Sequence, residues 1–172
     1  VMNAVRCWEE RLVIPTFSPG PVDPTPRFET YQGYHPYPYP YAYLHTDKIK
    51  SDVEYLALNL ENEYLRVTVL PHMGGRIYSI YDKIVQTELI HTPECINMNY
   101  LVPQPGGIFM GAGMELSAPD HHSITTWTKR EYSVQEHEDG SKSIIIGELE
   151  LRYRMRWALS LIHISEPTRL RR

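Results

Sequence analysis

The clearest pattern along this chain is an alternation of apolar and polar residues with a period of two. Residues 54–60 and 65–70 alternate in this way on either side of Asn62, a residue type that favours turns. Such alternation lets a strand bury one face and leave the other polar. The two runs therefore predict a β-hairpin that turns at Asn62.

A second hairpin is predicted where residues 131–137 and 143–151 flank the turn pair Asp139-Gly140. Aspartate followed by glycine is a strong short-range signal for a hairpin turn, because glycine adopts positive φ without steric cost. This segment is therefore expected to form two adjacent antiparallel strands.

The region after this hairpin shows the most regular alternation in the chain. Tyr153, Met155 and Trp157 occupy every second position, and the residues between them are arginines. The pattern predicts a further strand, with the Met155 and Trp157 side in the core and the arginine side in water.

The first 52 residues are distinguished by their prolines. A short strand is expected over residues 9–15 and should end at Pro15, because proline cannot donate a ladder hydrogen bond. Prolines are then spread over residues 16–28 and alternate with tyrosines over 31–45, which favours an extended strap lying along a sheet. We therefore assign 1–52 to an N-terminal strand and strap, and 53–159 to a partial β-sandwich.

No segment carries a sustained apolar stripe with helical spacing and capping residues. Several short strands separated by turn signals instead predict an all-β fold, namely an antiparallel β-sandwich. No nucleotide-binding, hydrolase or metalloprotease motif is present in the sequence.

Composition and charge narrow the functional classes. The 172 residues have a net charge of −4 and no basic stripe, which argues against a nucleic-acid partner. No apolar run approaches the roughly 18–20 residues of a membrane helix, and the first residues lack an apolar signal segment. Cys7 and Cys95 have no metal-binding spacing and are expected to be free thiols. We expect a cytoplasmic protein without a cofactor, a nucleic-acid partner or a membrane partner.

The segment Gly74-Gly75-Arg76 interrupts the alternation and leaves two alternatives open. Two glycines permit positive φ and a close approach of another backbone or a ligand. The guanidinium of Arg76 could then face a ligand, since its planar donors suit carboxylates, phosphates or vicinal hydroxyls. Equally, the glycines could form a β-bulge, with Arg76 paired to a nearby acid such as Asp82.

The glycine-rich stretch 111–122 is the second candidate for a functional site. Glu115 is followed within seven positions by Asp120, His121 and His122, a set suited to acid/base chemistry or to binding sugar hydroxyls. A metal held by Glu115, His121 and His122 is the less favoured alternative, because adjacent histidines in a strand point to opposite faces. We expect no metal.

We interpret the last residues of the chain as not native to the protein. Residues 159–169 resemble the translation of a transposase adapter used in sequencing libraries, so 160–172 are expected to be a non-native tail. The chain would then be an N-terminal fragment of a larger bacterial protein of metagenomic origin. The alternative is a native strand closed by Pro167.

Several segments, taken in order, resemble one family. They are IPTF, YQG with YPYP, LENEYLRVTVLPHMGGRIYSIYDK, GMELSAPDHHSITT, and EDGSKSIIIGELE with RMRW. Together they are similar to the DUF5107 domain of bacterial proteins over about residues 8–159.

The resemblance implies a β-sandwich of the galactose mutarotase type, a carbohydrate ligand, and a position ahead of tetratricopeptide repeats. It assigns substrate binding to Gly75, Arg76 and Glu115, and catalysis to Glu115, His121 and His122. The family usually has asparagine and tryptophan where this chain has Ser117 and Ala118, and the missing indole removes a stacking surface for a sugar.

We therefore expect a carbohydrate-binding or carbohydrate-processing domain. The general base of mutarotase-like proteins comes from late in the fold, so the fragment itself should be inactive. Two alternatives stand beside this one: a non-catalytic β-sandwich that acts as a scaffold or interaction module, and an aldose epimerase-type activity of the complete protein.

Overall fold

The computed structural model of the chain describes residues 5–18, 22–23, 30–31, 35–36, 41–42, 48–100, 108–117, 124–151 and 154–164. Within these residues the fold is all-β, which confirms the expected fold class. The described residues contain no α-helix, and the one helical element is a single 3-10 turn, η1 (Ile124–Thr126). Consequently, no helix in this part of the chain is long and apolar enough to cross a membrane.

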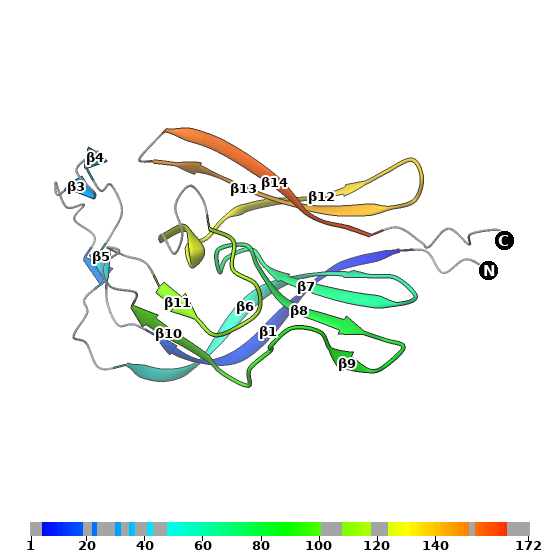
Figure 1. Ribbon diagram of the computed structural model, residues 1–172, viewed down its shortest axis with the longest axis horizontal. Coiled ribbons are helices and arrows are strands. Elements are labelled where there is room, and N and C mark those ends of the chain that lie inside the picture. Colours follow the sequence, from blue (N-terminus) through cyan, green and yellow to red (C-terminus); the bar gives the residue numbers. More distant parts are fainter. Residues whose placement is uncertain are drawn as a thin grey trace.

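The larger sheet has seven strands in the order β11-β10-β1-β6-β7-β8-β9 (Figure 1). Their bounds are β1 Arg6–Ser18, β6 Ile49–Glu61, β7 Leu65–Leu70, β8 Arg76–Asp82, β9 Thr87–Glu88, β10 Ile96–Tyr100 and β11 Ile108–Met110. All neighbours pair antiparallel except β1 and β10, which pair in parallel through Thr16 and Phe17. The sheet is therefore mixed, although a purely antiparallel one was expected.

The smaller sheet has three antiparallel strands in the order β12-β13-β14, with bounds β12 Glu131–Glu136, β13 Lys142–Glu150 and β14 Met155–Ile164. Figure 1 shows this sheet as a second layer beside the larger one. Four short strands form two further pairs: β2 Val22–Asp23 with β5 Tyr41–Ala42, and β3 Thr30–Tyr31 with β4 His35–Pro36. Most of the predicted proline- and tyrosine-rich strap lies outside the described residues.

The N-terminal strand is longer than predicted. β1 does not end at Pro15 but continues to Ser18, and it pairs with β6 over its whole length. Pairing with β10 begins only at Thr16, so among the described residues no strand needs the missing amide hydrogen of Pro15 on that side. The proline is tolerated because it lies where β1 has one strand neighbour.

Both predicted hairpins are confirmed. β6 and β7 are joined through Asn62, whose side-chain oxygen accepts hydrogen bonds from the amides of Tyr64 (2.9 Å) and Leu65 (2.8 Å). β12 and β13 are joined through Asp139 and Gly140, and Gly140 has a φ of 81°. In each case a side chain or a glycine provides the turn geometry that the sequence signal required.

The core has two clusters, which lie on opposite faces of the larger sheet, because β6 contributes Tyr55 and Ala57 to one and Leu58 and Leu60 to the other. One is centred on β6, β8, β10 and β11, and the other joins the two sheets. The second cluster contains Leu58, Val69 and Ile77 from the larger sheet and Ile144 and Ile146 from the smaller one. Burial of these apolar side chains from both layers makes the fold a sandwich.

β14 differs from its prediction in one respect. Met155 and Trp157 lie on the expected common face, but Met155 is 55% exposed and Trp157 is only half-buried. The expectation that this row lies in the core is therefore wrong for Met155. The physical reason is that Met155 begins β14, the edge strand of the smaller sheet, whereas Trp157 on the same face is covered by the guanidinium of Arg130.

The pairing of β14 with β13 also changes register along its length. It is regular from the Glu150–Met155 pair to the Ile145–Ser160 pair and then shifts, so Leu161 is an extra residue on β14. The shift lies directly after the expected end of the native sequence near Leu159. The adapter origin of residues 160–172 stays a prediction, as do the domain boundaries.

The Gly74-Gly75 turn joins β7 to β8 within the larger sheet and packs against η1 and β13. Both glycines have positive φ, 65° and 68°. A Cβ on Gly74 would lie 2.1 Å from the backbone oxygen of Thr126, and one on Gly75 would lie 2.6 Å from Cγ2 of Ile146. The turn therefore needs glycine for its conformation and also for the space between the layers.

Candidate functional site

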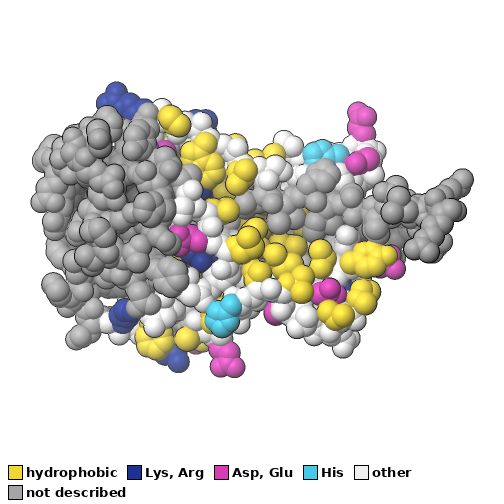
Figure 2. All heavy atoms as spheres, in the orientation of Figure 1, with side chains coloured by type: hydrophobic (Ala, Val, Ile, Leu, Met, Phe, Trp, Pro, Cys, Tyr) yellow, Lys and Arg dark blue, Asp and Glu magenta, His cyan; other side chains and the backbone are white. Residues whose placement is uncertain are grey.

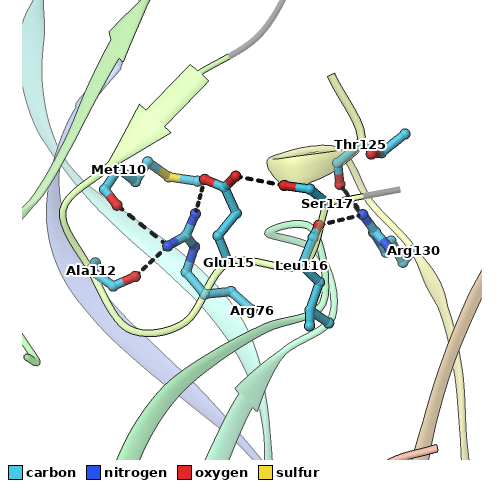
Figure 3. A network of polar contacts seen from close by, with 8 residues as sticks. All are labelled: Arg76, Met110, Ala112, Glu115, Leu116, Ser117, Thr125 and Arg130. Atoms are coloured by element: carbon cyan, nitrogen blue, oxygen red, sulfur yellow. Dashed lines mark hydrogen bonds and ion pairs between the residues drawn. The ribbon is translucent and has the colours of Figure 1, made fainter. Parts of the chain in front are cut away.

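A buried arginine lies at the centre of the candidate site. Arg76 is the first residue of β8, and its side chain is 1% exposed. Its guanidinium donates to the backbone oxygens of Ala112 and Met110, the latter at 3.4 Å, and to Glu115 Oε2 at 3.3 Å (Figure 3). The charge is thus enclosed by carbonyl oxygens and one carboxylate, as a buried cation requires.

The loop that carries Glu115 is fixed against β8 by backbone hydrogen bonds. Ile77 and Met114 form an isolated antiparallel bridge, with N···O distances of 2.8 Å and 3.3 Å. Gly113 has a φ of 60°, and a Cβ there would lie 2.2 Å from the backbone oxygen of Ile77. Gly113 therefore permits the close approach that brings Glu115 beside Arg76.

Both oxygens of Glu115 are held. Oε2 accepts from Arg76, and Oε1 accepts a 2.8 Å hydrogen bond from the Ser117 hydroxyl. The side chain of Glu115 is 14% exposed, whereas that of Ser117 is exposed. Because a carboxylate oxygen can accept more than one hydrogen bond, this fixed group retains the chemistry to accept from a polar ligand.

A second buried arginine, Arg130, adjoins this network and was missed by our sequence analysis. Its Nε donates to the oxygen of Thr125 at 3.0 Å, and its Nη2 donates to the oxygens of Thr125 (2.5 Å) and Leu116 (3.1 Å) (Figure 3). It therefore holds the 116–125 part of the chain at both ends. No local pattern distinguishes Arg130 from the other arginines, since its partners are backbone oxygens.

Arg130 also faces the smaller sheet. Its guanidinium lies 4.6 Å from the ring centroid of Trp157, and its Nε lies 4.0 Å from Glu148 Oε2. The two strands place Glu148 and Trp157 directly opposite each other. A cation on an aromatic face, next to a carboxylate, links the site to the inner face of this sheet.

The surroundings shift the pKa values of two groups here. Burial lowers the pKa of Arg76, and the charge and hydrogen bond of Glu115 oppose this. Burial raises the pKa of Glu148; Arg130 opposes the rise, Glu150 adds to it and Trp157 opposes it. Glu148 is therefore the carboxylate in this region whose protonated form is favoured by its environment.

The structure brings together some of the predicted site residues. Arg76 and Glu115 are in contact, and Gly75 lies against Ile146 and the side chain of Arg130. Direct contact of Arg76, Gly75 or Glu115 with a ligand stays a prediction. His121 and His122 lie outside the described residues.

The structure also shows which conformation Gly74 and Gly75 adopt and which acid pairs with Arg76. Gly74 and Gly75 lie in the turn that joins β7 to β8, so they do not form the bulge that one of the two alternatives required. The pairing of these strands does shift between Thr68 and Val69, but the extra residue is Tyr78 within β8. The acid that pairs with Arg76 is Glu115 and not Asp82, whose carboxylate accepts from the amides of Ile84 and Val85. Within the described part of the chain, no group of three or more histidine, cysteine, aspartate or glutamate side chains is arranged to hold a metal.

Comparison with known proteins supports the fold. The chain is similar to the crystal structure of a TPR-domain containing protein from Parabacteroides distasonis ATCC 8503, with a TM-score of 0.73 and 24% sequence identity. The similarity covers 93% of this chain and 28% of that protein, so the chain spans less than a third of its neighbour. The family described as a domain of unknown function (DUF5107) matches residues 33–168, and the chain belongs to this family.

Proposed function

We propose that this domain binds carbohydrate at the surface formed by Glu115 and Ser117, with Arg76 behind them. The observation that carries the proposal is the Glu115 carboxylate, which is fixed by Arg76 on one oxygen and by Ser117 on the other. A carboxylate held in one orientation accepts hydrogen bonds from sugar hydroxyls without losing further side-chain entropy.

Arg76 has a positioning role in this proposal. Its side chain is buried and its donors face Glu115 and two backbone oxygens, so it acts on a ligand through Glu115. Glu115 would contact the sugar, and the Ser117 hydroxyl would both orient Glu115 and adjoin the ligand.

In the complete protein, His121 or His122 would move the proton in acid/base chemistry at a sugar ring or glycosidic bond. The basis is their position four and five residues after Ser117, since they follow directly on a loop that Arg76 and Arg130 hold in place. Histidine suits this role because its ordinary pKa lies near neutral pH.

A titration of the 172-residue chain with neutral mono- and oligosaccharides tests the binding proposal, for example by isothermal calorimetry. The variant Glu115→Gln removes a charged acceptor, which is worth about 1.5–3 kcal/mol, so binding should weaken roughly 10- to 100-fold. Ser117→Ala should weaken it less. The control is Glu138→Gln, because Glu138 is exposed and lies in the β12–β13 turn.

Circular dichroism of each variant would separate lost binding from lost folding. If no sugar binds, or if Glu115→Gln and Glu138→Gln bind as the parent chain does, the site assignment is wrong. A complete protein that accelerates the mutarotation of a free aldose would further identify epimerase-type activity, and an unchanged rate would remove that alternative.

The second candidate is a non-catalytic interaction module beside helical repeats. Its support is the solved neighbour, which is described as a TPR-domain containing protein and is more than three times longer than the matched region. This candidate predicts that loss of Glu115 leaves the interactions of the complete protein unchanged. A pull-down that compares the complete protein with its Glu115→Gln variant distinguishes the two candidates.

A further inference from the structure

The inner face of β13 changes from apolar to acidic along the strand. Side chains alternate between the two faces of a strand, so the inward positions are Ile144, Ile146, Glu148 and Glu150. Ile144 and Ile146 are fully buried in the core cluster that joins the two sheets. The next two inward positions are carboxylates, and Glu150 is 1% exposed although its outward neighbour Leu149 is 48% exposed.

This arrangement is unfavourable for a strand that only has to fold. Inward carboxylates lose hydration, and an exposed leucine contributes little burial of apolar surface. Figure 2 shows that hydrophobic side chains do lie on the surface along β13 and β14. Exceptions to the apolar-inside pattern are expected mainly at functional sites, so the groups around the inward carboxylates indicate what such a site would bind.

Glu148, Arg130 and Trp157 form a cluster on this inner face. Oε2 of Glu148 lies 4.0 Å from Nε of Arg130, and the Arg130 guanidinium lies 4.6 Å from the ring centroid of Trp157. Arg130 is in turn fixed by backbone oxygens, since its Nη2 donates to Leu116 at 3.1 Å. Leu116 directly follows Glu115, so this cluster adjoins the proposed carbohydrate-binding surface.

Two polar atoms of the cluster are buried without a partner. Within the described part of the chain, neither Oε1 of Glu148 nor Nε1 of Trp157 makes a hydrogen bond. The two residues lie directly opposite each other on β13 and β14. Burial raises the pKa of Glu148 and the indole N–H opposes this rise, so the N–H is near the carboxylate but outside hydrogen-bond geometry. A buried donor and acceptor left unpaired each carry a desolvation cost, which a bound molecule would remove.

The groups around these two atoms determine which class of ligand fits. Glu148 would repel an anion, and Arg130 would repel a cation. A carboxylate or phosphate could moreover pair only with the indole N–H, and an ammonium only with Oε1 of Glu148. One hydroxyl group satisfies both atoms, because it accepts from a donor and donates to an acceptor at the same time. The cluster therefore suits a neutral, hydroxylated molecule.

We propose that Glu148 and Trp157 form a second subsite for carbohydrate, in which one sugar hydroxyl accepts from Nε1 of Trp157 and donates to Oε1 of Glu148. The identity of the ligand rests on the proposed function, but the side chains that bind it here are different ones. Both side chains reach the surface, since that of Glu148 is 13% exposed and Trp157 is half-buried. Arg130 has a positioning role, because it covers one face of the indole and connects the subsite with the loop of Glu115.

Calorimetric titration of variants with neutral mono- and oligosaccharides tests the subsite. Trp157→Phe removes the N–H but keeps an aromatic ring beside Arg130, and it should weaken binding about 2- to 10-fold. Glu148→Gln replaces a charged acceptor by a neutral one and should weaken binding by roughly the same factor. Trp8→Phe is the matched control and should bind as the parent chain does. Trp8 is also half-buried and has the guanidinium of Arg6 5.5 Å from its ring, but it lies on β1.

Intrinsic fluorescence provides a readout that needs no substitution in the subsite. The chain has three tryptophans, so in a variant with Trp8→Phe and Trp127→Phe the tryptophan emission comes from Trp157 alone. This emission should change as sugar is added, because the sugar hydroxyl pairs with the indole N–H.

The outcomes distinguish this subsite from the Glu115 surface. If Glu115→Gln weakens binding while Trp157→Phe and Glu148→Gln bind as the parent chain does, the Glu115 surface binds carbohydrate, the two buried atoms hold only water and the inference is overturned. In the reverse case the subsite stands and the Glu115 assignment is wrong. The inference is also overturned if the emission of Trp157 responds to no sugar, or if Trp8→Phe weakens binding as much as Trp157→Phe.

Discussion

Nη2 of Arg76 lies 3.3 Å from Oε2 of Glu115, although the two residues are 39 positions apart in the sequence. Arg76 opens a strand of the larger sheet, and Glu115 belongs to the loop after β11. Their contact fixes this loop on the sheet and so determines where the chain leading to His121 and His122 begins. The geometry of the candidate site therefore depends on this ion pair together with the backbone bridge between Ile77 and Met114.

Replacement of this arginine tests the pair directly. Arg76→Met keeps most of the side-chain volume but leaves Glu115 and two backbone oxygens without their donor. Loss of one partner of a buried pair costs about 3–5 kcal/mol in the free energy of unfolding, which urea denaturation measures. Arg11→Met is the control, because Arg11 is exposed and its 3.6 Å pair with Glu54 should contribute about 1 kcal/mol or less. Equal losses in both variants would contradict a special role for Arg76.

The Gly74-Gly75 turn gives a second prediction. Gly75→Ala places a methyl group 2.6 Å from Ile146 Cγ2, at a φ of 68°. Overpacking and the left-handed conformation each cost about 1–3 kcal/mol, so the melting temperature should fall by several degrees. Gly111→Ala should change it little, since nothing lies within 4 Å of a Cβ there. A Gly75→Ala variant as stable as Gly111→Ala would show that the layers are not in close contact at this turn.

The pH dependence of stability should include a contribution from Glu61. Burial by itself would raise the pKa of Glu61, but hydrogen bonds and charges from Lys83 and Arg6 outweigh it and lower the pKa. A lowered folded pKa means that Glu61 stabilises the fold above its unfolded pKa and that this contribution is lost as the pH falls through the folded pKa. Glu61→Gln should therefore cost about 1–2 kcal/mol at neutral pH and progressively less below about pH 4.5.

Urea denaturation between pH 3 and pH 7 measures this difference, with Glu63→Gln as the exposed control next to the same turn. A gap between parent and Glu61→Gln that stays constant over the whole range would contradict the assigned ion pairs.

Glu148 should contribute a pH dependence of stability with the opposite sign. Its pKa is raised by burial, with Arg130 opposing and Glu150 adding to the shift. A raised folded pKa gives a contribution that is present below the unfolded pKa and lost as the pH rises through the folded pKa. Glu148→Gln, which stays neutral, should thus gain stability relative to the parent chain as the pH rises from about 4 upwards. The same denaturation series measures it, and a relative loss at higher pH would mean that the attraction of Arg130 exceeds the cost of burial.

Much of the fold could be predicted from local sequence. The hairpins at Asn62 and at Asp139-Gly140 follow from alternation and from residues whose conformational preferences decide a turn. The end of β1 was mispredicted because a proline ends a strand only where a neighbouring strand needs its amide. The parallel pairing of β1 with β10 could not be predicted, because it joins residues about 80 positions apart. Met155 was misleading because alternation gives the face of a residue but not what covers that face.

Only part of the candidate site could be predicted from the sequence. Arg76 and Glu115 were singled out by the glycines beside them, and those glycines do adopt the conformations that bring the two residues together. The choice of Glu115 over Asp82 as the partner of Arg76 could not be made, because it depends on the bridge between Ile77 and Met114. Arg130 was missed since a buried cation that donates to backbone oxygens leaves no pattern in the sequence.

The Gly74-Gly75 turn has a consequence for how the domain folds. The amide of Gly74 donates to the oxygen of Thr128 at 2.9 Å, and the amide of Arg130 donates to the oxygen of Pro71 at 3.0 Å. The turn thus shares main-chain hydrogen bonds with the segment that leads into β12, in addition to the apolar contacts between the layers. Amide protons at Gly74 and Arg130 should exchange with solvent only when the whole sandwich opens, so the two sheets form a single cooperative unit and cannot be separated into independent ones.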